Sequence, residues 1–194
     1  MKEEEDEVSV YRKLQQNLDK LPISYPATES GVEIRILKHL FSPEWALIAS
    51  KLGSKPITLK DIYSKVEKDG IPLEKVEKAL DEMDTEGLIV RLVRKINDED
   101  VKSYVSLPFM LGFYEFQMNK FTEEFIYDVD QYCEEAFIGE LNKTKIPQLR
   151  TIPIESEIGV ERNVATYDDF RYYLENCGEP IVLNECICRK KNDL

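Results

Sequence analysis

Two cysteines near the end of the sequence, Cys186 and Cys188, have a spacing that suits a pair of metal ligands. The run from Ile181 to Cys188 is predicted to be a strand, on which residues two apart project to the same face. Two thiolates on one face can hold a soft metal or an iron–sulfur cluster, and the basic run Arg189-Lys190-Lys191 would stabilise them. The same spacing also fits two small apolar residues on a buried strand, so both interpretations stay open.

Two thiolates fall short of the four that zinc or a cubane iron–sulfur cluster normally takes. The other cysteines are Cys133, on a predicted acidic helix, and Cys177, at the end of a predicted helix, and we expect both to be structural. We therefore predict that Cys186 and Cys188 bind a cluster only within a longer protein. In these 194 residues alone, the pair is expected to hold no metal.

No residue pattern in the sequence indicates a catalytic site. His39, the one histidine, lies in an apolar stretch without a Ser or Cys nucleophile motif, so we expect a packed or surface histidine. The eight glycines form no cluster that could cradle a phosphate. Paired carboxylates such as Asp168-Asp169 and Glu134-Glu135 are explained by helix capping or by a solvated face. We therefore predict a protein without enzymatic activity.

The chain is strongly acidic, with 26 Lys and Arg against 38 Asp and Glu and a net charge of −12. Such a surface repels phosphate backbones, so contact with nucleic acid would need a local basic patch. The sequence begins with charged residues instead of a signal peptide, and its longest apolar stretch, 109–114, is too short to cross a bilayer. Four cysteines without a secretory signal indicate reduced thiols. We expect a cytoplasmic protein that binds neither nucleic acid nor membrane.

The elements that would position these residues are clearest in residues 31–107. Helix caps, glycine stops and apolar periodicity predict helices followed by two strands, with a turn at Asn97 to Asp100. Helix, short turn, helix and hairpin is the order of a winged helix-turn-helix. The expected elements are a helix opened by a capping box at Ser30 to Glu33, helices from Ser42 to Gly53, Thr58 to Lys68 and Pro72 to Glu86, and strands from Leu88 to Ile96 and Val101 to Leu107.

The segment from Pro72 to Gly87 would be the recognition helix of such a fold, and its charge argues against DNA binding. Six acidic residues face only Lys75 and Lys78, which leaves the segment at −4, and the predicted turn adds three more acids. Arg, Asn and Gln, which read base edges alongside Lys, are absent from this segment. We therefore expect a solvated or protein-facing helix. The acidic residues are Glu74, Glu77, Asp81, Glu82, Asp84 and Glu86, then Asp98, Glu99 and Asp100.

The predicted fold is α+β and mainly helical. Residues 1–30 are expected to form an acidic tail and a helix from Val8 to Lys20. Residues 108–146 are expected to be linking or dimerisation helices, the last capped by Thr122 and running to Leu141. Apolar residues there, including Phe109, Phe113 and Phe116, cover more than one helix face, which predicts a homodimer or an inter-domain contact.

Residues 147–194 are expected to form a small α/β unit after a linker at residues 142–146. Its predicted strands are Leu149 to Ile154 and Ile181 to Cys188, and a helix capped at Thr166 to Asp169 continues to Asn176. The Cys-x-Cys-Arg motif lies at the end of this unit.

Several segments together resemble a family of anaerobe 4Fe-4S ferredoxin-type proteins that carry an N-terminal winged-helix-like region. The matching segments are Val10–Leu14, Pro26–Glu33, Gly112–Gln117, Thr144–Pro153, Val164–Asp169 and Cys186–Arg189. In that family the Cys-x-Cys-Arg motif precedes further cysteine clusters and a C-terminal ferredoxin domain, and those later cysteines are absent from this sequence. The resemblance implies a 4Fe-4S cluster in the intact protein, with Cys186 and Cys188 among its ligands.

Together these patterns favour a non-catalytic N-terminal module of an iron–sulfur redox protein. The module would dock a protein partner, a redox domain or a second copy, and would position cluster domains for electron transfer. One alternative is a winged-helix transcriptional regulator that senses redox state through Cys186 and Cys188. Another is an enzyme subunit that lends a cluster to a partner oxidoreductase.

Overall fold

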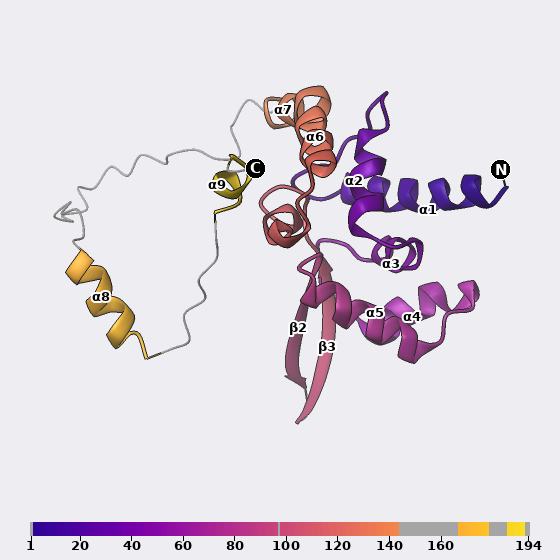
Figure 1. The fold of residues 1–194 in the computed structure, drawn as a ribbon. Helices are drawn as coiled ribbons and strands as arrows, with labels where there is room; N and C mark the ends of the chain where they lie inside the picture. Colours follow the sequence, from indigo (N-terminus) through magenta and orange to yellow (C-terminus); the bar gives the residue numbers. More distant parts are fainter. Residues whose placement is uncertain (1, 97, 144–166, 179–185, 193–194) are drawn as a thin grey trace.

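A computed structural model describes residues 2–96, 98–143, 167–178 and 186–192 of the chain. The protein has an α+β fold, as predicted, in which helices predominate and three antiparallel strands form one small sheet. The elements are α1 (Lys2–Leu18), α2 (Val32–Leu40), α3 (Pro43–Ala49), β1 (Ile57–Thr58), α4 (Leu59–Val66), α5 (Leu73–Thr85), β2 (Ile89–Ile96), β3 (Glu99–Ser106), α6 (Glu123–Tyr132), α7 (Ile138–Leu141), α8 (Tyr167–Asn176) and α9 (Ile187–Asn192). Figure 1 shows α1, α2, α3, α6 and α7 gathered above α4, α5 and a projecting β2–β3 hairpin. Among the described helices, none combines the length and hydrophobicity needed to cross a membrane.

A buried ion pair joins α1 to α2. The Glu33 carboxylate is fully buried in the first turn of α2 and lies 2.8 Å from the Arg12 guanidinium of α1. Tyr25, on the connector between the two helices, donates a hydrogen bond to the Glu33 carbonyl. The Tyr25 carbonyl in turn accepts a hydrogen bond from Gln15 of α1. Both helices and their connector are therefore tied together through an ion pair and hydrogen bonds between mostly buried polar groups.

An aromatic cluster fills the space between this connector and α6. The Tyr25 ring lies 5.2 Å from Phe109 and 4.7 Å from Tyr132, and Phe109 packs 5.4 Å from Phe113, measured between ring centroids. Beside the cluster, the half-exposed Arg35 guanidinium of α2 donates a 2.7 Å hydrogen bond to the buried Asp128 of α6. These contacts fix α6 against α2 and form the main apolar core.

The helix predicted after Thr122 is present, with one irregular turn. The Thr122 hydroxyl accepts a 3.1 Å hydrogen bond from the Phe125 amide and begins α6 as expected. A π-helical turn, Cys133–Phe137, then joins α6 to α7, which ends at Leu141. The widened turn changes the helix phase, and both Tyr132 and Phe137 are buried.

The paired helices and the hairpin follow the prediction closely. The Thr58 hydroxyl accepts a hydrogen bond from the Asp61 amide and caps α4. Gly70 and Gly87 end the two helical segments with φ angles of 75° and 69°, a conformation that favours glycine. The hairpin turn is shorter than predicted, because β3 already begins at Glu99 and Asp98 adopts a φ of 63°.

A two-residue strand, β1, was missed by the sequence analysis. It pairs antiparallel with β3, with Ile57 opposite Tyr104, so the strand order is β1-β3-β2. Two residues are too few for a period-two pattern to be recognised. Because β3 is central, the outer edge of β2 is not paired with another strand in the described part of the chain.

The prediction that residues 108–120 belong to a helix with apolar residues on more than one face is wrong. Only two short 3-10 turns, Phe113–Phe116 and Met118–Lys120, are present. The amides of Leu111 and Gly112 bond to the Glu115 carboxylate, at 3.0 and 2.9 Å, instead of to helical carbonyls. The chain turns sharply there, with a φ of 55° at Leu111.

The same segment was the basis for predicting a homodimer. Phe109 and Phe113 are buried inside this chain, whereas Leu111 and Phe116 are 61% and 57% exposed. Packing within one chain therefore explains part of the apolar surface that motivated the dimer, and the dimer itself stays a prediction.

Two expectations near the N-terminus also need correction. The predicted acidic tail is part of α1, which already begins at Lys2; glutamates are good helix formers and are favoured in a first turn. The capping box at Ser30 does not form, because Gly31 is the residue before α2 and Glu33 is drawn to Arg12.

The C-terminal region agrees with the prediction at one helix and departs from it at another element. The predicted helix ending at Asn176 is present as α8, and its residues from Arg171 onward are exposed. The segment predicted as the end of a strand contains α9 instead, from Ile187 to Asn192. The predicted strand at residues 149–154, most of the linker and the Thr166 cap lie outside the described residues.

The tight turn at Gly112 gives a test of this packing. A Cβ atom at Gly112 would lie 2.0 Å from the Pro108 carbonyl oxygen, whereas one at Gly139, in α7, would meet nothing within 4 Å. We expect Gly112→Ala to lower the free energy of unfolding by about 2 kcal/mol or more. The control Gly139→Ala should raise it by about 0.5–1 kcal/mol, because alanine is the better helix former. Urea unfolding followed by circular dichroism measures both, and equal stability of the two variants would contradict the described turn.

Candidate functional site

Asp81, on α5, is the centre of a charged cluster that joins α5 to the hairpin. Its carboxylate accepts hydrogen bonds from Lys102 at 2.8 Å, from the Tyr104 hydroxyl at 2.9 Å and from Arg91 at 3.1 Å. Arg91 comes from β2, and the other two come from β3. Three donors from two strands therefore converge on one helix residue.

The cluster stabilises the ionised form of Asp81. Partial burial would raise its pKa, but the hydrogen bonds from Lys102, Tyr104 and Arg91 outweigh that effect and hold the pKa below its usual value. The pKa of Lys102 is raised by its hydrogen bonds to Asp81 and Glu77. Burial and the bond to Asp81 raise the pKa of Tyr104, so its hydroxyl stays a donor. The arrangement suits a structural clamp between helix and sheet.

The other cations around α5 are also matched by carboxylates. Lys75 pairs with Glu44 of α3, and Lys78 lies 3.7 Å from Glu82 one turn along α5. Arg91 also contacts Asp84, at 3.4 Å. With its two lysines paired, α5 presents an acidic surface to the solvent, as the sequence analysis expected.

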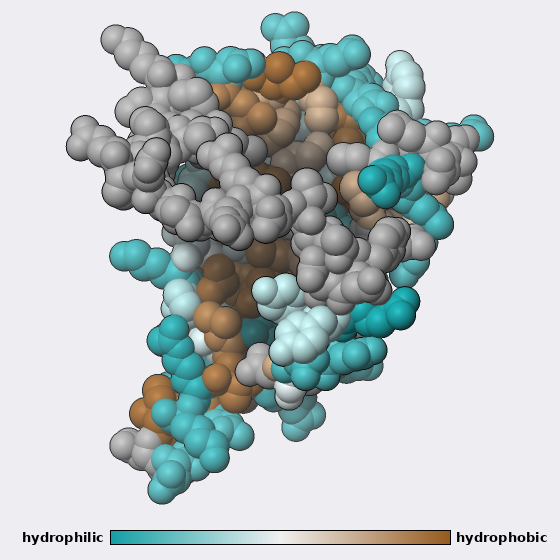
Figure 2. Space-filling model, turned by 90° about the vertical axis from the view of Figure 1, so that its left-hand side faces the viewer, coloured by the Kyte–Doolittle hydropathy of each residue, from teal (hydrophilic) through white to brown (hydrophobic). Residues whose placement is uncertain are grey.

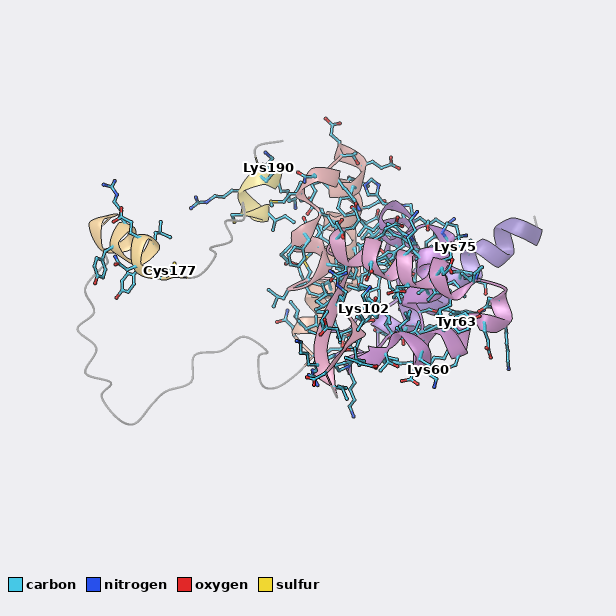
Figure 3. All side chains as sticks on the ribbon, turned by 90° about the horizontal axis from the view of Figure 1, so that it is seen from below. Lys60, Tyr63, Lys75, Lys102, Cys177 and Lys190 are labelled. Carbon is cyan, nitrogen blue, oxygen red and sulfur yellow. The ribbon has the colours of Figure 1, made fainter. Side chains whose placement is uncertain are left out.

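A shallow groove of about 650 Å³ lies between α4, the first turns of α5 and β3. Its apolar lining includes Tyr63 and Leu73, and Leu73 is 43% exposed. Figure 3 shows Lys60 and Tyr63 of α4 near Lys102 of β3 on this underside of the molecule. Two lysines and two acids line it as well, so the groove has no net charge from which to infer a ligand.

A second hollow, of about 610 Å³, lies between α3 and α5 and is lined by Trp45, the only tryptophan. Lys78, Asp81, Glu82, Thr85 and Glu86 complete its lining. Glu86 is paired with Lys120 at 2.8 Å. The hollow therefore places a half-buried indole beside the acidic face of α5.

The structure changes the geometry expected around Cys186 and Cys188. The prediction that both sulfurs project to one face requires a strand. Cys186 instead immediately precedes α9, and Cys188 belongs to this helix. The Cys186 carbonyl accepts hydrogen bonds from the amides of Arg189 and Lys190 and starts the helix. Three basic residues in the last turn favour this short helix, because they face its negative dipole end. Cys186 is exposed, and the side chain of Cys188 lies outside the described residues.

The helix α9 packs near Cys133. Ile187 is buried, and Lys191 forms an ion pair with Asp130 of α6. Burial and the charge of Asp130 raise the pKa of Cys133, which disfavours its thiolate. Cys177 is exposed at the end of α8. Among the described residues, no group of three or more His, Cys, Asp or Glu is arranged to hold a metal, so these residues alone do not fit a four-ligand site.

His39 behaves as a surface packing residue. Its ring stacks on Phe125 with 4.5 Å between centroids, and Nε2 lies 3.1 Å from the Lys120 carbonyl oxygen. These contacts agree with the expected packed or surface histidine and link α2 to the start of α6.

Comparison of the chain with models of known protein families, with curated proteins and with solved structures found no significant match. The family resemblance of the sequence segments therefore stays a prediction.

The acidic face of α5 follows from the sequence, whereas the Asp81 cluster was not predicted. Strand alternation carried the signal: Arg91 faces Tyr104 in the hairpin register, and Lys102 lies two residues before Tyr104 on the same face. Alternation places these three donors on one face of the hairpin. An acidic helix next to that face could therefore have been predicted to bind them.

Replacing Asp81 should weaken the clamp in a pH-dependent way. We expect Asp81→Asn to lower the free energy of unfolding by about 1–2 kcal/mol at pH 7, since a partly exposed carboxylate loses three donors. Because the folded pKa of Asp81 lies below its unfolded value, this contribution is present above about pH 5 and is lost as the pH falls through the folded pKa. Urea unfolding of both proteins between pH 7 and pH 2 measures the difference. Glu74→Gln, an exposed site on the same helix, is the control, and equal pH dependence of the two variants would refute the clamp.

Proposed function

We propose that this chain is a non-catalytic docking module in which residues 31–107 form a winged helix that contacts protein instead of DNA. The order α3, β1, α4, α5 and the hairpin, with the sheet order β1-β3-β2, supports a winged helix. In such a fold α5 would occupy the position of the recognition helix.

The observation that carries the proposal is the charge state of α5. Its segment has a net charge of −4, and Lys75 and Lys78 already face Glu44 and Glu82. Arg91 and Lys102, the nearest cations of the hairpin, are bound to acids of α5. A duplex approaching this surface would meet an excess of negative charge, and the two lysines of α5 already have carboxylate partners, whereas a basic or neutral protein surface would meet no repulsion.

The module belongs, in this proposal, to an iron–sulfur redox protein. Support comes from the sequence resemblance and from the exposed Cys186 beside a basic helix turn. The cluster-bearing domain is then the natural docking partner, and Cys186 and Cys188 contribute ligands that further cysteines complete. The resident cluster would supply the electron transfer, and the residues of this chain would hold its domain in position.

The proposal predicts that the chain lacks useful affinity for duplex DNA. At physiological salt we expect no anisotropy change of a labelled random-sequence duplex below about 1 µM protein, whereas specific binders reach about 10⁻⁸ M. The matched control is the double variant Glu74→Lys, Glu82→Lys, which should gain weak, salt-sensitive binding. Salt-sensitive binding by the wild-type chain in this range would contradict the assignment of α5 to protein contact.

The iron–sulfur assignment predicts a loss of iron when either ligand is replaced. Protein expressed from its whole reading frame and purified without oxygen should contain iron and acid-labile sulfide. Cys186→Ser and Cys188→Ser should each lower both contents while leaving the circular dichroism of the helices unchanged, since serine is nearly the size of cysteine. The control variant is Cys177→Ser, which should leave the iron and sulfide contents unchanged. Unchanged iron in both variants, or a wild-type protein without iron, would remove these cysteines from the proposal.

A further inference from the structure

The outer edge of β2 has backbone groups that are open to pairing. The Arg91 amide points away from β3, because it donates a 2.8 Å hydrogen bond to Asp84 of α5. In an antiparallel pair the outward direction alternates, so the peptide groups of Val93 and Lys95 also point outward. Neither makes a backbone hydrogen bond on that side with any residue that the structure describes. Beyond Arg91 the edge is therefore available to another strand.

Next to this edge lies an apolar stripe on the hairpin face turned away from α5. Arg91, Lys102 and Tyr104 reach α5 from the opposite face, so by alternation the other face carries the even residues of β2 and the odd residues of β3. Figure 2 shows hydrophobic side chains along the hairpin in the lower half of the view. The apolar residues of this face are Val90, Leu92, Ile96, Val101 and Val105, of which Ile96 is 53% exposed and the others are partly buried, and the exposed Arg94 lies between Leu92 and Ile96 on the same face.

The stripe leads into a hollow of about 500 Å³ at the start of β2. Val90, Leu107 and Phe116 provide its apolar walls. Phe116 is 57% exposed but held in place, because its Cβ packs so closely over Gly87 that a Cβ there would lie 2.4 Å away. An exposed aromatic ring that is fixed by packing suits binding, since little side-chain freedom is lost on contact.

The charge of β2 differs from that of the chain as a whole. β2 contains Arg91, Arg94 and Lys95 and no acidic residue, in a chain of net charge −12. Arg94 and Lys95 are exposed and form no ion pair with any described residue. They project to opposite faces of the edge strand, so a negatively charged neighbour is favoured on either face.

We propose that the outer edge of β2 receives an acidic, extended segment of a partner protein as a fourth strand. Its backbone pairs with Val93 and Lys95, its carboxylates lie on the sheet face of Lys95, and its apolar side chains cover the stripe on the opposite face, beside Arg94, and enter the hollow next to Phe116. The inference rests on the proposed docking function and names the chemistry of one partner segment.

A second copy of this chain fits the edge poorly. Antiparallel pairing of two β2 strands centred on Val93 would place Arg91 opposite Lys95, and pairing centred on Arg94 would oppose two guanidinium groups. Like charges in such positions destabilise a sheet, and basic residues on an edge are a common protection against self-association. Nucleic acid is disfavoured by Asp98, Glu99 and Asp100 at the tip of the hairpin.

The test uses fluorescein-labelled heptapeptides and the full 194-residue chain. We expect a peptide of alternating glutamate and valine to bind, and one of alternating lysine and valine to bind at least about tenfold more weakly. The double variant Arg94→Glu, Lys95→Glu should reverse this preference, whereas Lys68→Glu, an exposed control on the turn after α4, should not change it. Val93→Pro should weaken glutamate–valine binding at least about tenfold, because it removes an outward amide that β3 does not use. Circular dichroism identifies any variant that fails to fold.

Several results of this experiment would contradict an acidic fourth strand on β2. Absence of binding up to millimolar peptide, or a preference that charge reversal does not invert, would overturn the proposal. Self-association of the wild-type chain that Arg94→Glu, Lys95→Glu changes would point to a second copy instead. A labelled duplex that binds and is lost with the same variant would point to nucleic acid. The iron content of the intact protein is independent of all these results, so failure here and failure of the iron–sulfur assignment can be told apart.

Discussion

The buried carboxylate of Glu33 is the constraint on which the helical body depends. A carboxylate removed from water is costly unless cations or donors satisfy it, and here it meets the Arg12 guanidinium and the Thr28 hydroxyl. Those partners lie on α1 and on the connector, so α2 cannot pack without fixing both. The fixed connector brings Tyr25 against Phe109 and Tyr132, which sets the course of the chain after the hairpin and the position of α6.

In the lower part of the molecule a charged cluster adds to the apolar packing. Val76, Leu80 and Met83 of α5 are buried in the same hydrophobic core as the helical body. The partly exposed Asp81 cluster then ties α5 to the hairpin from outside that core. As a result, the acids of α5 bind the inner cations of the hairpin and leave Arg94 and Lys95 on the outside. The protein therefore presents an acidic helix on one side and a basic strand edge on another.

The parts of the fold that the sequence predicted well have strong local signals. Thr58, Gly70 and Gly87 mark the ends of α4 and α5, and alternation marks the hairpin. Residues 108–120 were misassigned because the apolar spacing suited a helix, while the deciding contacts were the Glu115 carboxylate and the close approach of Gly112 to Pro108. Neither of these two contacts can be recognised from the spacing of apolar residues along the sequence.

The end of the chain was misassigned for a related reason. The apolar run before Cys188 resembles a strand, but the basic residues that follow stabilise a short helix, and α9 also gains an ion pair with Asp130 from a distant segment. At the candidate site, the negative net charge of α5 was predicted correctly, because the net charge depends only on which residues the segment contains. The open edge of β2 depends on the strand order, which composition does not contain.

The lone tryptophan has a spectroscopic consequence. Trp45 stands at the seam between α3 of the helical body and α5 of the lower part, half-buried and beside a group of carboxylates. Its emission is therefore the single intrinsic indole signal of the chain, and its wavelength follows the polarity of that seam alone. A shift to the red at constant helix content would mean that α3 and α5 have moved apart before either helix unfolds. Trp45 is therefore a built-in fluorophore that reports the contact between these two helices.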